Sequence, residues 1–190
     1  MGSNRRINRV GVLALAVIFF LGVRPAAAVL DVPLPLAKLL TDSEAIFVAK
    51  VEKVDSEKPS AVLVATKSLK GKMLWPRLPI NLAGDKEKHT PMLLKRIAPD
   101  VPVVVYAMKF DGDYMLLAYT NGTWFQVAGR TDGDDTRFSF THGEPYLRRT
   151  FKGTTDELVQ VTTDVLAGKR KAPALTKEPP GFGPELEAKK

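Results

Sequence analysis

The sequence predicts a mainly β domain, an antiparallel barrel or strongly curved sheet of five to six strands with one short helix and one packed C-terminal helix. The strongest observation is a pair of two-residue turns, Asp111-Gly112 and Asn121-Gly122, which separate three apolar runs between Val101 and Ala128. This pattern is typical of an antiparallel meander. A second observation is a pair of earlier apolar runs, Ala45–Val54 and Ala61–Leu69, joined by a polar loop. An open sheet with the helix across one face is the alternative architecture.

Two weaker strand signals lie on either side of the meander. Arg77–Leu82 is short and contains Pro79, and because proline cannot donate a hydrogen bond to a neighbouring strand, we expect this strand at a sheet edge. After the acidic turn Asp132–Asp135, Phe138 and Phe140 alternate with polar residues, which predicts one more half-exposed strand.

The helices carry recognisable end signals. Thr90-Pro91 begins a short helix, since proline suits the first helical position. The last element is a helix over Thr155–Ala167, in which Thr154 and Glu157 form a capping box and Gly168 provides the usual terminating glycine. Its apolar residues fall on one face at spacings of three and four.

The first 28 residues have the order of a secretory signal peptide. A positive start is followed by an uncharged apolar run of about 13 residues, Gly11–Val23, and by Ala26-Ala27-Ala28. The run is too short to span a membrane, which needs roughly 20 residues. We therefore expect cleavage after Ala28, a single β-rich domain over 29–168, and a disordered Pro/Lys-rich tail over 169–190.

Charge and cysteine content exclude some functions. Four of the 28 basic residues lie in the signal segment, so the remainder sets 24 basic against 21 acidic side chains. This small excess argues against a nucleic-acid partner, which would require a strong basic patch. The chain has no cysteine, which excludes disulfides, a cysteine nucleophile and a thiolate metal site.

The aromatic face of the meander is the first candidate site. Pairing through the two turns places Tyr119 opposite Trp124 and Leu117 opposite Tyr106, which gathers aromatic and methionine side chains on one face. We expect the C-terminal helix or the Leu36–Leu40 segment to cover this face, because large exposed apolar patches are rare on monomers. The functional alternative is a partner that contacts Tyr119, Trp124 and Tyr106.

The second candidate is a metal-assisted site. His142 and Glu144 stand two residues apart and follow the acidic turn Asp132–Asp135, but their spacing matches no zinc pattern. The turn lacks the glutamate that closes a calcium loop, since Gly143 occupies that position. We expect His89 and His142 to be two exposed, unconnected loop histidines, and we expect neither metal nor cofactor.

One stretch resembles a known family. The runs Asp42–Val51 and Val62–Gly71 are similar to the first hairpin of bacterial netrin-like or tissue-inhibitor-like secreted domains, which begin with a short helix and a strand of the type "aDaiFvGkV". The resemblance implies an OB-like fold, a five-stranded barrel with a helix packed alongside. Animal members use an N-terminal cysteine to ligate a protease's zinc. The present chain has none, so neither protease inhibition nor any functional residue is carried over.

Together these observations predict a non-catalytic binding or accessory module of the bacterial cell envelope, secreted or periplasmic. Its partner would be an unidentified envelope protein or ligand, and no membrane span would remain after signal cleavage. The alternative is a small envelope hydrolase that uses His142, Glu144 and the Asp132–Asp135 turn.

Overall fold

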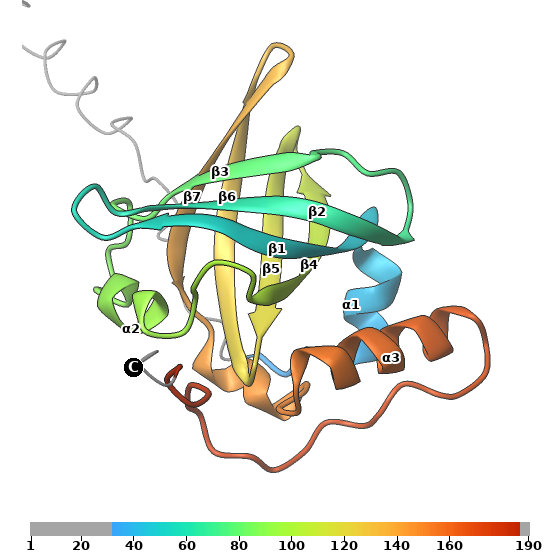
Figure 1. The fold of residues 1–190 in the computed structure, drawn as a ribbon. Coiled ribbons are helices and arrows are strands. Elements are labelled where there is room, and N and C mark those ends of the chain that lie inside the picture. Colours follow the sequence, from blue (N-terminus) through green and yellow to red (C-terminus); the bar gives the residue numbers. More distant parts are fainter. Residues whose placement is uncertain (1–31, 187–190) are drawn as a thin grey trace, which may run out of the picture.

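The structure is a computed structural model that describes residues 32–186. Its strands form a closed barrel in the order β1-β2-β3-β7-β6-β5-β4, and helices cover one side of it (Figure 1). The predicted signal segment and its cleavage position lie outside the described residues. Within 32–186, no helix is both long and apolar enough to cross a membrane.

Seven strands build the barrel, so the expected number of five to six is wrong. All the predicted runs are strands, and the two weakest signals pair with each other to close the barrel. The strands are β1 Ala45–Asp55, β2 Ser60–Lys70, β3 Arg77–Asn81, β4 Pro102–Phe110, β5 Asp113–Thr120, β6 Thr123–Asp132 and β7 Asp135–Gly143. The helical elements are α1 Leu36–Asp42, α2 Thr90–Leu94, the 3₁₀ helix η1 Pro145–Arg149 and α3 Thr155–Leu166.

The predicted meander is confirmed. Asp111, Gly112, Asn121 and Gly122 all have positive φ, between 39° and 88°, as the two tight hairpin turns require. The register pairs Tyr119 with Trp124 and Tyr106 with Leu117, as predicted. Tight turns fix the register of the strands that they join, which is why this part could be read from the sequence.

The barrel closes through a parallel contact between β3 and β7. The barrel is mainly antiparallel, as expected, but the expectation that the Arg77–Leu82 strand lies at a sheet edge is wrong. The contact is nevertheless minimal, because only Ile80 pairs with Phe138 and Asn81 with Ser139. The other strand contacts are antiparallel. The β3–β7 contact, which we call the seam, lies on the side of the barrel away from α1 and α3 (Figure 1).

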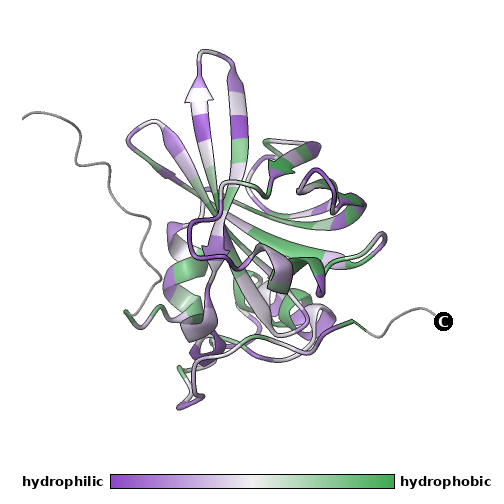
Figure 2. Ribbon diagram, turned by 90° about the vertical axis from the view of Figure 1, so that its left-hand side faces the viewer, coloured by the Kyte–Doolittle hydropathy of each residue, from purple (hydrophilic) through white to green (hydrophobic). Residues whose placement is uncertain are grey.

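Two hydrophobic cores share the sheet. The inner face of the barrel holds small and branched residues such as Val103, Val105 and Ala107, together with phenylalanines. The outer face of β1, β4, β5 and β6 packs against α1, η1 and α3 and holds Tyr106, Tyr119 and Trp124. Figure 2 shows hydrophobic residues concentrated in the body and hydrophilic stripes on the projecting hairpin. The predicted covering of the aromatic face is thus what the structure shows.

α3 begins and ends where the sequence indicates. Thr154 accepts a hydrogen bond from the Glu157 amide, and the Glu157 carboxylate accepts one from the Thr154 amide, which completes the capping box. Gly168 follows the helix with φ of 69°.

The segment after α3 differs from the expected disordered tail. Residues 176–186, which we call the strap, run back along η1 toward α2 (Figure 1). The Thr176 amide donates to the Arg149 carbonyl over 2.9 Å, Gly181 to Pro145 over 3.0 Å and Leu186 to Lys95 over 2.9 Å. A chain rich in proline and glycine forms no helix of its own, so its amides are free to bond with the body of the protein.

Candidate functional site

The three predicted aromatic residues are structural in this conformation. Tyr106 and Tyr119 are 0% exposed and Trp124 is 1% exposed. The Tyr106 hydroxyl lies 2.9 Å from Thr162 Oγ1 of α3, and Trp124 Nε1 donates to the Phe151 carbonyl over 3.0 Å. The polar ends of these side chains thus hold α3 and the segment before it, and a partner could contact them only if α3 moved.

Burial also changes the acidity of the two tyrosines. Loss of contact with water raises the pKa of Tyr106 well above the usual tyrosine range, and its hydrogen bond with Thr162 offsets only part of this effect. Burial likewise raises the pKa of Tyr119, which accepts a hydrogen bond from the Gly122 amide over 2.9 Å. Both hydroxyls therefore remain protonated in the folded protein at neutral pH.

The expectation of two exposed, unconnected histidines is wrong. His142 is 0% exposed, because β7 continues to Gly143 and so holds residue 142 in the sheet opposite Gln126, not in a surface loop. Its Nε2 lies 2.7 Å from Oε1 of Glu144, which is also fully buried, while Nδ1 has no hydrogen-bond partner among the described residues. His89 is only partly buried, and its Nδ1 accepts a hydrogen bond from the Gly143 amide over 3.1 Å.

The residues of the hydrolase alternative are far apart. Asp135 and His142 stand at opposite ends of β7, seven residues or roughly 23 Å apart at the usual rise of a strand. Within residues 32–186, no group of three histidine, aspartate or glutamate side chains could hold a metal ion. The predicted turn Asp132–Asp135 forms the tip of the β6–β7 hairpin.

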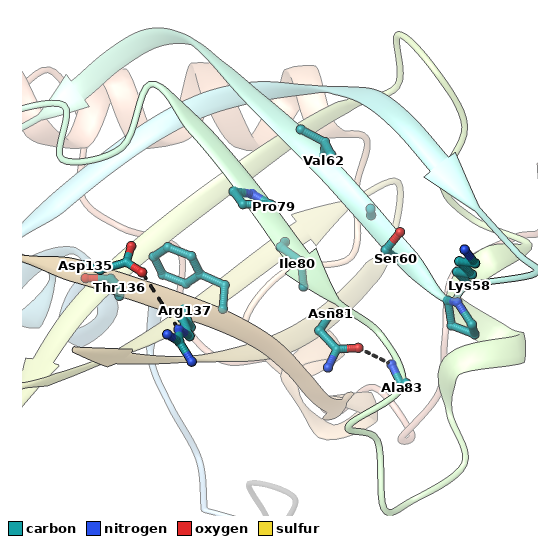
Figure 3. A pocket seen from close by; sticks show the side chains of 13 residues that line it. Lys58, Ser60, Val62, Pro79, Ile80, Asn81, Ala83, Asp135, Thr136 and Arg137 are labelled. Carbon is teal, nitrogen blue, oxygen red and sulfur yellow. Dashed lines mark hydrogen bonds and ion pairs between the residues drawn. The ribbon is translucent and has the colours of Figure 1, made fainter. Parts of the chain in front are cut away.

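The candidate site is a groove at the seam. It has a volume of about 590 Å³ and lies on the outer surface where β2, β3 and β7 meet. Figure 3 shows Val62 and Pro79 on one wall and Thr136 and Arg137 on the other. This volume falls within the range of sites that bind small molecules or peptide side chains.

The groove exists because the seam is short. β7 begins at Asp135, but its pairing with β3 begins only at Phe138. The three residues before Phe138 therefore have no strand on their β3 side, and the two strands diverge there. Pro79 stands at the point of divergence, and proline has no amide hydrogen with which to extend a ladder.

The groove has an apolar floor and charged ends. Val62 and Pro79 supply apolar surface, and Lys58, at the end of the β1–β2 loop, is exposed. At the other end, Arg137 Nε lies 3.8 Å from the Asp135 carboxylate, and both side chains are largely exposed. Two cations thus face one carboxylate, which favours a neutral or acidic ligand.

A second hollow lies on the opposite side of β7. It has a volume of about 720 Å³ and is lined by β6, β7 and the loop around Lys86. Arg137 lines both hollows. In the ladder Arg137 pairs with Arg130, so both side chains project from the same face of the β6–β7 hairpin. β7, which carries Arg137, therefore separates the groove from this second hollow.

Sequence reasoning missed the groove, although it noticed the residue that creates it. Pro79 indicated an interruption in strand pairing, and the interruption is real. The strand that meets β3 could not be identified, because β7 lies 58 positions later and forms a parallel contact of only two residues. Comparison of the chain with protein-family models, curated proteins and solved structures finds no match.

Proposed function

We propose that the chain is an exported, non-catalytic binding or accessory module of the bacterial cell envelope, and that its partner binds in the groove at the seam. The observation that carries this proposal is the division of the barrel surface. α1, η1 and α3 occupy one side and bury its apolar residues, whereas the groove lies at the seam, on the side away from α1 and α3.

The groove has the features of a recognition site. Its apolar floor can exclude water from a ligand, and the charged residues at its ends can orient that ligand. Three separate segments of the chain line it: 58–62, 79–83 and 135–138. Such a surface is held by the whole barrel, so its shape does not depend on one flexible loop.

We also propose that the barrel is an OB-type barrel enlarged by two strands. The closed barrel, the short helix before β1 and the helix packed alongside support this assignment. OB-type barrels serve mainly as binding platforms, which agrees with a non-catalytic role.

Export is the remaining part of the proposal, and it depends on the sequence of the first 28 residues. We expect the processed protein to begin at Val29. N-terminal sequencing of the chain recovered from outside the cytoplasm tests this expectation, and an exported chain that still begins at Met1 would contradict it.

Site-specific photo-crosslinking in exporting bacterial cells tests the binding site. A photoreactive phenylalanine analogue at Asn81, an exposed residue of the groove, should give covalent adducts with the partner. The matched control places the same analogue at Gln160, an exposed residue of α3. Equal adduct patterns from both positions, or none from Asn81, would reject the groove as the binding site.

A further inference from the structure

Among residues 32–186, no strand pairs with the side of the Thr136 main chain that faces the groove. A two-residue loop joins β6 to β7, so Asp132 and Asp135 form a hydrogen-bonded pair and the next pair, Thr131 and Thr136, is not hydrogen-bonded. The amide and carbonyl groups of that next pair point away from the hairpin. Thr131 shows this directly, because its amide donates to the Asp113 carboxylate on the other side over 2.9 Å.

On the opposite wall of the groove, β3 also has main-chain groups that face the gap. The Pro76 carbonyl accepts a hydrogen bond from Ala65 on β2, and the Leu82 amide donates to Pro59. The even-numbered residues of β3 therefore face β2, and the odd-numbered residues Arg77 and Pro79 face β7. Pro79 cannot donate to the Thr136 carbonyl, so the ladder ends there, and the main chain of Arg77 also faces the gap.

We propose that the groove binds an extended polypeptide segment of a partner protein, which adds as a strand between the diverging ends of β3 and β7. This inference rests on the proposed function and names its ligand class. Free amide and carbonyl groups on a strand edge are satisfied by another extended main chain, as in recognition by strand addition. The cations Lys58 and Arg137 favour a segment that carries acidic side chains.

The barrel core below the gap is already closed. The Trp75 ring packs edge-on against Phe138, with 4.9 Å between centroids, and against Tyr114, with 4.7 Å between centroids. Phe138 lines the groove, and Trp75, which is partly buried, packs behind it against the barrel core. A bound segment would pack its inward side chains on the groove floor, including Phe138, and the core would stay intact.

Selection from a displayed library of linear nine-residue peptides provides the probe. The processed chain is the target, and the best selected peptide is synthesised for calorimetric titration. Thr136→Pro removes the free amide, which the β6–β7 hairpin does not use, and should weaken binding at least tenfold. Thr136→Val keeps the amide and removes only the hydroxyl, so it should bind within about twofold of the parent protein.

A second measurement keeps the test valid if the proline variant does not fold. In an extended peptide, alternate amides point to opposite edges. N-methylation of the set that bonds to the groove should abolish binding, and N-methylation of the other set should leave binding unchanged. Hydrogen exchange at the Thr136 amide should slow on peptide binding. A library that yields no binder sensitive to Thr136→Pro or to peptide methylation would overturn the proposal. The proposal would also be overturned if the protein bound no peptide and instead formed a dimer through the seam, as measured by sedimentation.

The two proposals can fail separately. Cross-links from Asn81 that persist unchanged in Thr136→Pro would retain the groove as a binding site and reject strand addition. Absence of cross-links from Asn81 would reject the groove itself, whatever the peptide selection gives.

Discussion

Trp124 joins the outer face of the sheet to the segment that leads into α3. Its indole is almost fully buried, packs 4.7 Å from the Tyr119 ring and donates a hydrogen bond to Phe151. We expect Trp124→Ala to lower the free energy of unfolding by about 3–5 kcal/mol, because truncation leaves a cavity and an unpaired carbonyl. Urea denaturation measures this change.

Phe110 is the control for that substitution. It lies on the same outer face of the sheet but is 56% exposed, so Phe110→Ala should change stability by less than about 1 kcal/mol. A Trp124→Ala protein as stable as the parent would show that the aromatic face is not needed for folding, and would renew the case for a partner there.

Tyr106 and Tyr119 make the stability of the fold sensitive to high pH. In the unfolded chain they lose their protons near pH 10, whereas burial raises their pKa in the folded protein. The unfolded state therefore binds fewer protons above pH 10, and stability falls as pH rises from that point. The slope should be about 1.4 kcal/mol per pH unit for each tyrosine, and below pH 10 the contribution is fully present.

A double variant isolates this effect from other groups that titrate at high pH. Tyr106→Phe combined with Tyr119→Phe removes both hydroxyls and keeps both rings. Its free energy of unfolding, measured between pH 9 and 11.5, should decline less steeply than that of the parent protein. Parallel curves for the two proteins would show that the hydroxyls are not the cause.

At the scale of the elements, Pro79 decides how far β3 and β7 pair. Pro79→Val supplies an amide that can donate to the Thr136 carbonyl and extend the seam by one hydrogen bond. We expect the new amide at position 79 to exchange at least tenfold more slowly than it would in an unstructured peptide. We also expect the selected peptide to bind more weakly, since the seam then occupies its own free groups.

Hydrogen exchange followed by NMR reads the new amide of the Pro79→Val variant directly. The amide of Asn81 is the internal control, since this residue pairs with Ser139 whether or not position 79 is proline. An unprotected amide at position 79 would mean that something other than proline separates the two strands.

Local signals predicted the elements, and long-range contacts decided their assembly. The Asp-Gly and Asn-Gly turns and the capping box of Thr154 and Glu157 act within a few residues, so the meander and α3 were readable. The β3–β7 contact joins residues 58 positions apart and has no turn to fix its register. For the same reason the groove, which that contact creates, could not be predicted.

His142 shows the same limit within the candidate site. The even-numbered residues Phe138 and Phe140 of this strand lie inside the barrel. A register shift between Gln126 and Val127 interrupts this alternation, so that His142, opposite Gln126, is buried on the face away from Phe125 and Val127. By local pattern alone, a histidine followed by glycine is more typical of a loop. The pairing of Gln126 with His142 and Phe125 with Gly143 keeps this segment in the sheet.

At the scale of the whole molecule, the strap connects distant parts of the surface. Gly183 donates to Thr123 Oγ1 over 3.0 Å, and its carbonyl accepts a hydrogen bond from Arg96 of the α2 region. A Cβ at Gly183 would overlap the Asn121 carbonyl oxygen. We therefore expect Gly183→Ala to detach the end of the strap and to speed trypsin cleavage after Lys177 at least tenfold.

Gly181→Ala is the matched control. A Cβ at this position would meet the Arg148 side chain at an ordinary 3.4 Å, so the strap should stay in place. Mass spectrometry of timed digests separates the two variants. Equal cleavage rates after Lys177 would show that the strap does not depend on the fit of Gly183.

The seam also sets the order of events during synthesis. β3 leaves the ribosome 58 residues before its partner β7, which at about 5–20 residues per second is a delay of about 3–12 s. Until β7 emerges the barrel cannot close, so the inner apolar residues beside the open seam stay exposed and can associate with other chains. The nascent chain is therefore most vulnerable to aggregation in the seconds before its last strand emerges, when a chaperone would have the most to protect.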